Sequence, residues 1–334
     1  MNKESKTNRL LTMYIAGALA LLFVALITVS ALLIHIKNLS VQIGKLETEA
    51  VTLSTQLESF DRSTCDSQYT ITGANTLTKY TIESAGYVRT YQVRTPHNYD
   101  PSVRYPVVVS FDGIEGSGNR MQAYSGLDIL PAIIVYPDSI PGNQGFTAWQ
   151  GAPYSLDGDY DVHFTRAVLD ALPSQYCTDS TKVFAVGMSN GGGFAVIAGC
   201  KLGDRIHAVA SVSGAYYQSC AREERTPSFL VLHSVSDKQV PLTGAVDRKL
   251  PAVPLLVEEQ AKDRQCETKL PAVSTETVTT YDWLDCQDDS LLRLVVLSDQ
   301  PHGWLQVPPT SLDIQTTASY IWKFFKDSMY FNKQ

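Results

Sequence analysis

The first apolar stretch of the chain is unlike the rest. Residues 10–34 contain no charged side chain and are dominated by Leu, Ala, Ile and Val, which is enough to cross a bilayer core of about 30 Å as a helix. Basic residues precede this stretch and, by the positive-inside rule, keep the short N-terminus in the cytosol: Lys3, Lys6 and Arg9. We therefore expect a cytosolic segment 1–9, an uncleaved membrane anchor 10–36, and an extracellular or periplasmic remainder. A signal peptide cleaved near residues 29–31, giving a secreted protein, is the alternative, although its apolar region would exceed the usual 7–15 residues.

Residues 37–60 follow with a heptad pattern. The two core positions carry only apolar side chains: Ile36, Ile43, Ala50 and Leu57 at one, and Leu39, Leu46, Leu53 and Phe60 at the other. This pattern predicts a helical stalk that could join copies of the chain in a short parallel coiled coil. Because it spans only about three and a half heptads and few charges flank it, a single amphipathic spacer helix is the alternative.

From residue 61 to 334 the pattern is that of one α/β domain. Alternating, Thr-rich stretches at 77–82 and 87–93 predict an antiparallel hairpin. Short β-branched runs then follow without alternation, as expected for strands buried on both faces of a parallel sheet: 106–111, 132–136, 183–186, 208–212, 229–232 and 291–297. Helical patterns separate several of them: 162–176, 190–200, 253–264 and 312–330. We expect a mostly parallel central sheet with helices on both faces.

Composition and charge narrow the class of partner. The chain has 334 residues, 44% of them hydrophobic and 18% charged, as in globular proteins. A net charge of −7 and the lack of a basic stripe exclude nucleic acid as a partner. Six cysteines all follow the anchor, and this even number suits three disulfides. Without a C-x-x-C pair or a Cys/His cluster, we expect no metal site.

A G-x-S-x-G pentapeptide, Gly187-Met188-Ser189-Asn190-Gly191, joins the strand predicted over 183–186 to the helix predicted over 190–200. A serine in such a tight turn has a strained backbone, and the flanking glycines let the strand and the helix approach without Cβ clashes. An ordinary glycine-rich turn is the alternative. The strand-turn-helix setting favours Ser189 as a nucleophile.

A serine nucleophile needs a base and an acid that orients the base. His302 follows the last predicted strand in a Pro/Gly-marked loop, and Asp237 follows the strand before it, so both lie at the carboxyl edge of the sheet. Asp247 is the runner-up for the acid, and His233 simply closes a strand. The order Ser189, Asp237, His302 is that of the α/β-hydrolase triad.

A serine that attacks a carbonyl group also needs N–H donors for the oxyanion of the tetrahedral intermediate. The backbone N–H of Asn190, directly after the nucleophile, is one candidate. We expect the second from the oxyanion loop (residues 111–118), with Ile114 N–H the preferred donor. The alternative is that this loop is a mobile Gly-rich turn.

Several further stretches have the form of one family: AIIVYPD, AWQGAPY, SVSGAYY, VLHSVSDKQVPLTG and PHGW. Through these, residues 80–325 resemble the secreted feruloyl esterases of the α/β-hydrolase fold, which are related to acetylxylan esterases and poly(3-hydroxybutyrate) depolymerases. The resemblance implies that Ser189, Asp237 and His302 are the triad. It also implies that three aromatic residues lie near the substrate cleft: Trp149, Tyr154 and Trp304. They could stack on a phenolic ring or a sugar face, or could equally be core residues.

Two positions depart from the family pattern. Where the family usually has His-Gly, this chain has Asp112-Gly113, so a carboxylate near the oxyanion loop would tighten or alter that site while the donor at Ile114 survives. Asp237 is retained, but its neighbours Ser236 and Lys238 differ from the glycine-rich pattern of the family.

The six cysteines allow fifteen connectivities, among which the sequence does not decide. If the strand from Lys182 and the helix from Asn190 run antiparallel, about six residues at 3.3 Å and eleven at 1.5 Å return the chain to nearly the same level. This arrangement would let Cys177 meet Cys200. Cys266 and Cys286 bracket a local excursion that contains Trp283 and are the natural second pair, which leaves Cys65 with Cys220.

The sequence therefore predicts a membrane-anchored, extracytoplasmic serine carboxylic-ester hydrolase that forms an acyl-enzyme and needs no cofactor. The resemblance implies feruloyl or acetyl esters of polysaccharide as substrates. A polyester depolymerase or a peptidase on the same fold is one alternative, because pocket shape lies in variable loops. The other is a catalytically weak ectodomain that binds carbohydrate or a surface partner, which Asp112 and the stalk favour.

Overall fold

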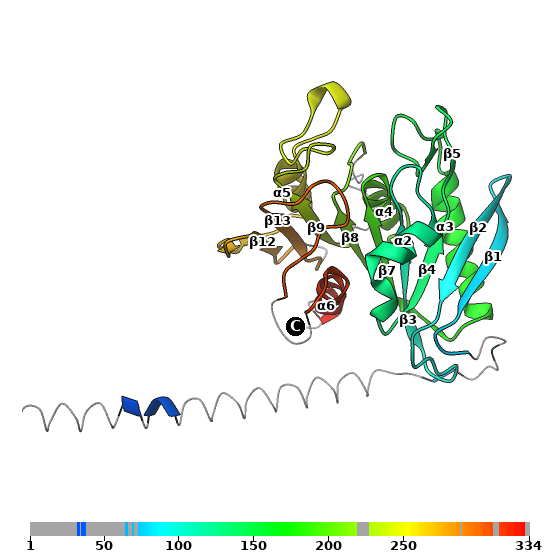
Figure 1. Ribbon diagram of the computed structural model, residues 1–334, viewed down its shortest axis with the longest axis horizontal. Coiled ribbons are helices and arrows are strands. Elements are labelled where there is room, and N and C mark those ends of the chain that lie inside the picture. The colour runs from blue at the N-terminus through cyan, green and yellow to red at the C-terminus, as the bar shows by residue number, and fades with distance from the viewer. Residues whose placement is uncertain are drawn as a thin grey trace, which may run out of the picture. The chain divides into compact units, whose positions relative to one another are not determined.

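The computed structural model describes residues 32–33, 35–37, 64–65, 69, 73–218, 227–287, 289–309 and 314–330 (Figure 1). The chain divides into two compact units, Met1–Ser63 and Thr64–Gln334, and the described residues of the first unit are helical. Among the described residues, no helix is both long enough and apolar enough to span a bilayer. The anchor predicted over 10–36 and the stalk predicted over 37–60 lie almost entirely outside the described residues. They stay predictions, as does an oligomer formed through the stalk.

The second unit is built on an 11-stranded sheet with the strand order β1-β2-β4-β3-β7-β8-β9-β13-β12-β10, and β11 pairs with β12. Neighbouring strands from β4 to β13 run parallel, whereas pairing is antiparallel at both edges of the sheet. The strands are β1 (Leu77–Ser84), β2 (Tyr87–Arg94), β3 (Tyr105–Phe111), β4 (Ile133–Pro137), β7 (Thr178–Met188), β8 (Ala208–Val212), β9 (Ser228–Ser234), β10 (Thr268–Lys269), β11 (Val273–Ser274), β12 (Val278–Leu284) and β13 (Leu292–Leu297). A separate short ribbon pairs β5 (Ile140–Pro141) with β6 (Thr147–Ala148).

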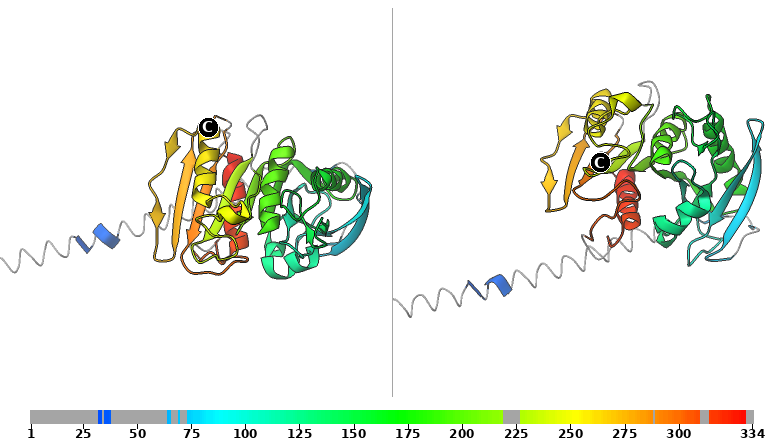
Figure 2. Two further views of the ribbon diagram at one scale, coloured as in Figure 1. Left: turned by 90° about the horizontal axis from the view of Figure 1, so that it is seen from above. Right: turned by 45° about the horizontal axis from the view of Figure 1, so that its top comes forward.

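Helices cover both faces of this sheet (Figure 2). They are α2 (Gly118–Ser125), α3 (Tyr160–Ala171), α4 (Asn190–Lys201), α5 (Val253–Asp263) and α6 (Thr317–Tyr330). Side chains alternate between the faces along each strand. One aligned row therefore packs with α3, α4 and α5: Val109, Ala185, Val209, Phe229 and Leu292. The residues of the opposite face, such as Val108 and Phe184, pack with α2 and α6.

The predicted parallel-sheet α/β arrangement is confirmed, including the β1–β2 hairpin and every predicted buried strand. Helix α2 was not predicted, because Met121 is its only large buried side chain and leaves no apolar stripe. Helix α6 begins at Thr317 and not at residue 312. Thr316 Oγ1 accepts a hydrogen bond from Ser319 N–H (3.2 Å), which caps the helix at this point.

The predicted disulfide between Cys177 and Cys200 is wrong, and so is the one between Cys65 and Cys220, because Cys65 is bonded to Cys177. The disulfide lies beside the start of β3, and Cys177 directly precedes β7. Cys65 N–H donates to Ser102 O (3.0 Å), and Cys177 O accepts from Tyr105 N–H (3.0 Å). Cys200 is also disulfide-bonded, and Cys220 lies outside the described residues. The predicted bond between Cys266 and Cys286 is confirmed.

Candidate active site

Ser189 occupies a strained turn between β7 and α4. Its backbone has φ 56° and ψ −122°, a conformation that non-glycine residues rarely adopt. The turn is held by the Ser189 N–H bond to Val212 O (3.0 Å). A Cβ on Gly187 would lie 2.1 Å from Gly191 O, and one on Gly191 would lie 2.3 Å from Phe111 O. The two glycines are therefore required by the close approach of strand, helix and β3, as the pentapeptide predicted.

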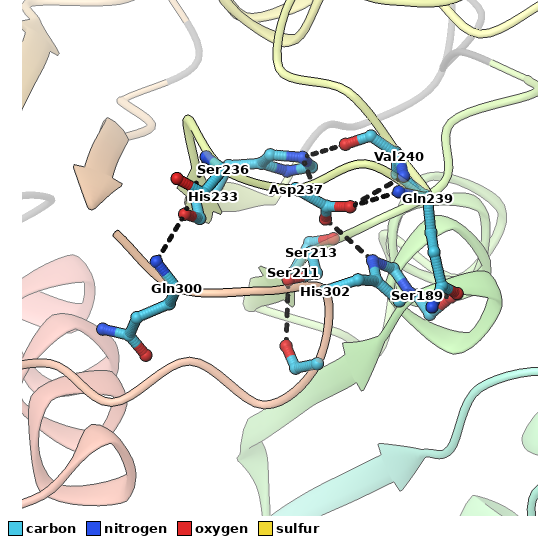
Figure 3. A network of polar contacts seen from close by, with 12 residues as sticks. Ser189, Ser211, Ser213, His233, Ser236, Asp237, Gln239, Val240, Gln300 and His302 are labelled. Carbon is cyan, nitrogen blue, oxygen red and sulfur yellow. Dashed lines mark hydrogen bonds and ion pairs between the residues drawn. The ribbon is translucent and has the colours of Figure 1, made fainter. Parts of the chain in front are cut away.

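The structure brings Ser189, His302 and Asp237 together (Figure 3). His302 Nε2 lies 2.9 Å from Ser189 Oγ, and His302 Nδ1 lies 2.7 Å from Asp237 Oδ2. The three side chains come from loops that follow β7, β9 and β13, at the carboxyl edge of parallel strands. Since a carboxylate can only accept, Nδ1–H donates to Asp237 and Nε2 is left as the acceptor for the Ser189 hydroxyl.

Asp237 is held in place by its own loop. Its Oδ1 accepts the N–H groups of Gln239 (2.9 Å) and Val240 (2.8 Å), and its side chain is fully buried. Burial alone would raise the pKa of Asp237, but the hydrogen bonds from His302 and Val240 outweigh it and lower the pKa. The carboxylate is therefore ionised at neutral pH.

His233 is a second histidine beside this carboxylate, and sequence reasoning missed its role. It is fully buried, its Nε2–H donates to Val240 O (2.7 Å), and Nε2 lies 3.6 Å from Asp237 Oδ2. Figure 3 shows His233 and His302 on opposite sides of Asp237. Burial lowers the pKa of His233, so the ring is neutral and braces the loop that holds Asp237. Its position at the end of β9, four residues before Asp237, was the only signal in the sequence.

The oxyanion loop lies directly against Ser189. A Cβ on Gly113 would be 3.3 Å from Ser189 Cβ, so the peptide between Gly113 and Ile114 borders the nucleophile. The N–H groups of Ile114 and Asn190 have no acceptor within the part of the chain that the structure describes. The Asn190 side chain is engaged elsewhere, because its Oδ1 accepts from Trp149 N–H (2.8 Å) and its Nδ2 donates to Trp149 O (3.1 Å).

Comparison with known proteins identifies the family of the chain. The family model described as "Putative esterase" matches residues 82–280. The chain belongs to this esterase family. Among curated relatives, feruloyl esterase B of Piromyces equi is 32% identical over 122 residues, which are 35% of this chain and 22% of that protein. Feruloyl esterase C of Emericella nidulans is 27% identical over 167 residues, 47% of this chain and 58% of that protein. The chain thus covers less than two thirds of these relatives' own length.

Solved structures share the fold of this esterase. Acetyl xylan esterase from Aspergillus awamori superposes with a TM-score of 0.57 at 15% identity, covering 75% of this chain and 99% of that one. An S-formylglutathione hydrolase from Agrobacterium tumefaciens gives a TM-score of 0.51 at 15% identity, covering 79% and 98%. These likenesses establish the α/β-hydrolase fold that the resemblance implied.

The three predicted substrate-contacting aromatics of the esterase lie in different surroundings. Trp149 is 1% exposed and stacks on Phe194 (centroids 5.2 Å apart), as expected for the alternative that it is a core residue. Its Nε1–H donates to Asp112 O (2.9 Å). Tyr154 and Trp304 are half-buried. Tyr154 packs edge-on against Tyr217 at 6.1 Å, and burial raises the pKa of its phenol.

One cavity of about 300 Å³ lies beside Tyr217. It is lined by residues 150–153 and 155–159 together with Tyr217, Gln218 and Lys249, and none of the triad residues borders it. Within the described residues, no three His, Cys, Asp or Glu side chains gather as metal ligands do.

Proposed function

We propose that this esterase hydrolyses carboxylic esters through Ser189, His302 and Asp237. The observation that carries the proposal is the hydrogen-bonded path from the Asp237 carboxylate through the imidazole to Ser189 Oγ, with steps of 2.7 and 2.9 Å. The strained backbone of Ser189 is a second support, because strain of this kind clusters at functional sites.

The chemistry follows from the hydrogen-bond directions. His302 Nε2 takes the hydroxyl proton of Ser189 as Oγ attacks the ester carbonyl. As the carbonyl oxygen becomes negatively charged, it accepts hydrogen bonds from the N–H groups of Ile114 and Asn190. His302 then protonates the leaving alcohol, which leaves an acyl-enzyme, and later activates the water that releases the acid. Asp237 stays ionised and stabilises the imidazolium, in keeping with its lowered pKa.

Feruloyl or acetyl esters of polysaccharides are the proposed substrates. The support is the family, together with the names of relatives: feruloyl esterases and a bifunctional acetylxylan esterase/xylanase of Neocallimastix patriciarum, 23% identical over 249 residues, 72% of this chain and 33% of that protein. A polyester depolymerase or a peptidase would use the same three residues, so substrate comparison separates them.

We also propose that residues 10–36 anchor the protein in a membrane, with residues 1–9 in the cytosol and the catalytic unit outside. The disulfides support an oxidising compartment. Mass spectrometry of the mature protein tests this proposal. Residues 1–31 retained in a carbonate-resistant membrane fraction would support it, and soluble protein that lacks them would show signal cleavage instead.

Turnover by the detergent-solubilised full-length protein tests the enzyme proposal. We expect hydrolysis of p-nitrophenyl acetate, and of methyl ferulate or acetylated xylan, with kcat reduced about 10⁵-fold or more in Ser189→Ala. Ser174→Ala, the same change at an exposed serine, is the matched control and should keep the wild-type rate. Equal rates for wild type and Ser189→Ala would reject the proposal. Turnover of acetylated xylan without methyl ferulate would assign the acyl group to acetate.

A further inference from the structure

The carboxylate of Asp112 is buried and fully engaged inside the oxyanion loop. Its Oδ1 accepts from Gly113 N–H (2.7 Å), from the Tyr124 hydroxyl (2.6 Å) and from Arg120 Nη2 (3.3 Å). Its Oδ2 accepts from Arg120 Nε (2.7 Å) and Ser117 N–H (3.1 Å). Arg120 therefore neutralises the charge that the sequence placed near the oxyanion, and the carboxylate is not directed at a substrate.

Arg120 also reaches the turn that contains the predicted donor. Beyond Asp112, its Nη2 lies 3.4 Å from Ile114 O and its Nη1 lies 3.5 Å from Glu115 O. A guanidinium presents several donors in one rigid fork, which suits it to hold a carboxylate and neighbouring carbonyls together. One side chain thus joins the two ends of the loop segment 112–115.

The direction of Ile114 N–H follows from the hydrogen bond that the preceding carbonyl, Gly113 O, accepts. Gly113 O accepts from Gly116 N–H (3.0 Å), and since a trans peptide is planar, the N–H of Ile114 must point the opposite way from this carbonyl. Gly116 in turn packs on the carboxylate so closely that a Cβ there would lie 2.4 Å from Asp112 Cγ. Asp112 Oδ2 also accepts the N–H of Ser117 (3.1 Å), the residue after Gly116, so the carboxylate is bonded to the turn whose Gly116 N–H holds the Gly113 carbonyl.

Tyr124 ties this arrangement to the histidine loop. Burial, and then the charge of Asp112, raise the pKa of Tyr124, so its hydroxyl stays protonated and donates to the carboxylate. Its ring packs against Trp304, with centroids 6.0 Å apart, and Trp304 follows His302 by two residues. The oxyanion donor and the catalytic base are thereby connected through one packed tyrosine.

We propose that Arg120 and Tyr124 are positioning residues which, through Asp112, hold Ile114 N–H toward the oxyanion. The proposal rests on the proposed esterase function and identifies what orients one of its donors. Arg120 lies outside the G-x-S-x-G motif and outside the triad, on a helix that the sequence pattern did not predict.

Steady-state kinetics of full-length variants on p-nitrophenyl acetate tests it. Arg120→Lys keeps the charge, but a single ammonium cannot hold the carboxylate and both carbonyls. We expect kcat to fall about 10- to 100-fold with KM changed less than about threefold. This loss is smaller than the roughly 10²- to 10³-fold fall in kcat that follows removal of a whole oxyanion donor. Tyr124→Phe, which loses only the hydroxyl, should lower kcat about 3- to 10-fold.

Arg166→Lys is the matched control. Arg166 makes two hydrogen bonds to Asp204 (3.0 and 3.1 Å), and its side chain is 39% exposed against 48% for Arg120. Its partner Asp204 lies outside the site. We expect its kcat to stay within about twofold of wild type.

A second measurement separates loss of orientation from loss of folded protein. In the thionoester analogue of the substrate, sulfur replaces the carbonyl oxygen and is a weak acceptor, so it gains less from oxyanion donors. The ratio of ester to thionoester rates does not depend on the folded fraction, and it should fall in Arg120→Lys by the same factor as kcat. An unchanged ratio in Arg120→Lys would overturn the positioning role, whether or not kcat falls. Equal turnover by wild type and Ser189→Ala would instead overturn the esterase function itself.

Discussion

Replacing Asp237 by Asn should change the protonation of His302 with little change in shape. Oδ1 of Asp237 accepts two backbone N–H groups, from Gln239 and Val240, and Oδ2 accepts His302 Nδ1–H. An amide has one acceptor oxygen, and the two backbone donors select it. The NH₂ group must then face His302, which forces Nδ1 to become the acceptor and moves the ring proton to Nε2.

The expected loss is large because the reaction begins at Nε2. With a proton on Nε2, His302 donates to Ser189 Oγ and cannot take its hydrogen, so the base is lost while the imidazole stays in place. Loss of this tautomer in a serine hydrolase triad lowers kcat about 10⁴-fold, which corresponds to about 5.4 kcal/mol of activation free energy. Since the backbone hydrogen bonds of the loop survive, we expect only a few degrees of change in the unfolding midpoint.

The assay is hydrolysis of p-nitrophenyl acetate, with circular dichroism on the same samples to confirm folding. Asp247→Asn is the control, because Asp247 was the runner-up acid and is exposed in the loop beyond Asp237. Its kcat should stay within about twofold of wild type. If Asp237→Asn kept kcat within tenfold of wild type, or if Asp247→Asn lost as much, the assignment of the acid would be refuted.

Three further predictions concern stability and packing. Burial lowers the pKa of His233 from 6.5, so the unfolded chain binds a proton below that pH which the folded chain does not, and the free energy of unfolding falls as the pH drops from 7 to 5. In urea unfolding at pH 7 and pH 5, this fall in the free energy of unfolding should be smaller for His233→Gln than for wild type, by up to about 1.4 kcal/mol per pH unit. Equal slopes in the two proteins would contradict a buried neutral ring. Peptide mapping without reduction should join Cys65 to Cys177, and replacing both by Ser should cost about 2–4 kcal/mol in urea unfolding; a Cys177–Cys200 peptide would contradict the structure. Trp149→Phe should lower the free energy of unfolding by about 1–3 kcal/mol and leave KM for methyl ferulate unchanged. A raised KM with unchanged stability would indicate instead that the indole contacts the substrate.

The sheet and the meeting of the three site residues could be predicted because their signals are local. Strands buried on both faces carry continuous β-branched runs, and a loop after a parallel strand must emerge at the carboxyl edge of the sheet. Ser189, Asp237 and His302 each follow such a run, so their approach within hydrogen-bonding distance needed no knowledge of side-chain packing.

The disulfide and the bracing histidine could not be predicted, because each depends on contacts between distant segments. The predicted position of Cys177 opposite Cys200 assumed a strand that begins near Lys182. In the structure β7 already begins at Thr178, which pairs with Tyr105, and the register of β7 against β3 shifts between Tyr105 and Val107. An isolated β-bridge between Thr64 and Val103 brings Cys65 close to Cys177, and no periodic pattern in the sequence predicts this bridge. His233 looks like any residue at the end of a strand until the loop after it folds back onto its ring.

Asp112 shows why a departure at one position is not evidence against catalysis by itself. A carboxylate in place of histidine beside an oxyanion would oppose the developing charge if it were unpaired. Its counter-charge lies eight residues later on α2, at Arg120, and its hydroxyl donor lies twelve residues later, at Tyr124. Both belong to a helix with too little apolar character to be predicted. The sequence pattern therefore showed the carboxylate of Asp112 but not the arginine that neutralises it. The residues that shape the oxyanion loop therefore have to be judged together. Arg120→Lys tests them more directly than a change at Asp112, which would remove five hydrogen bonds at once.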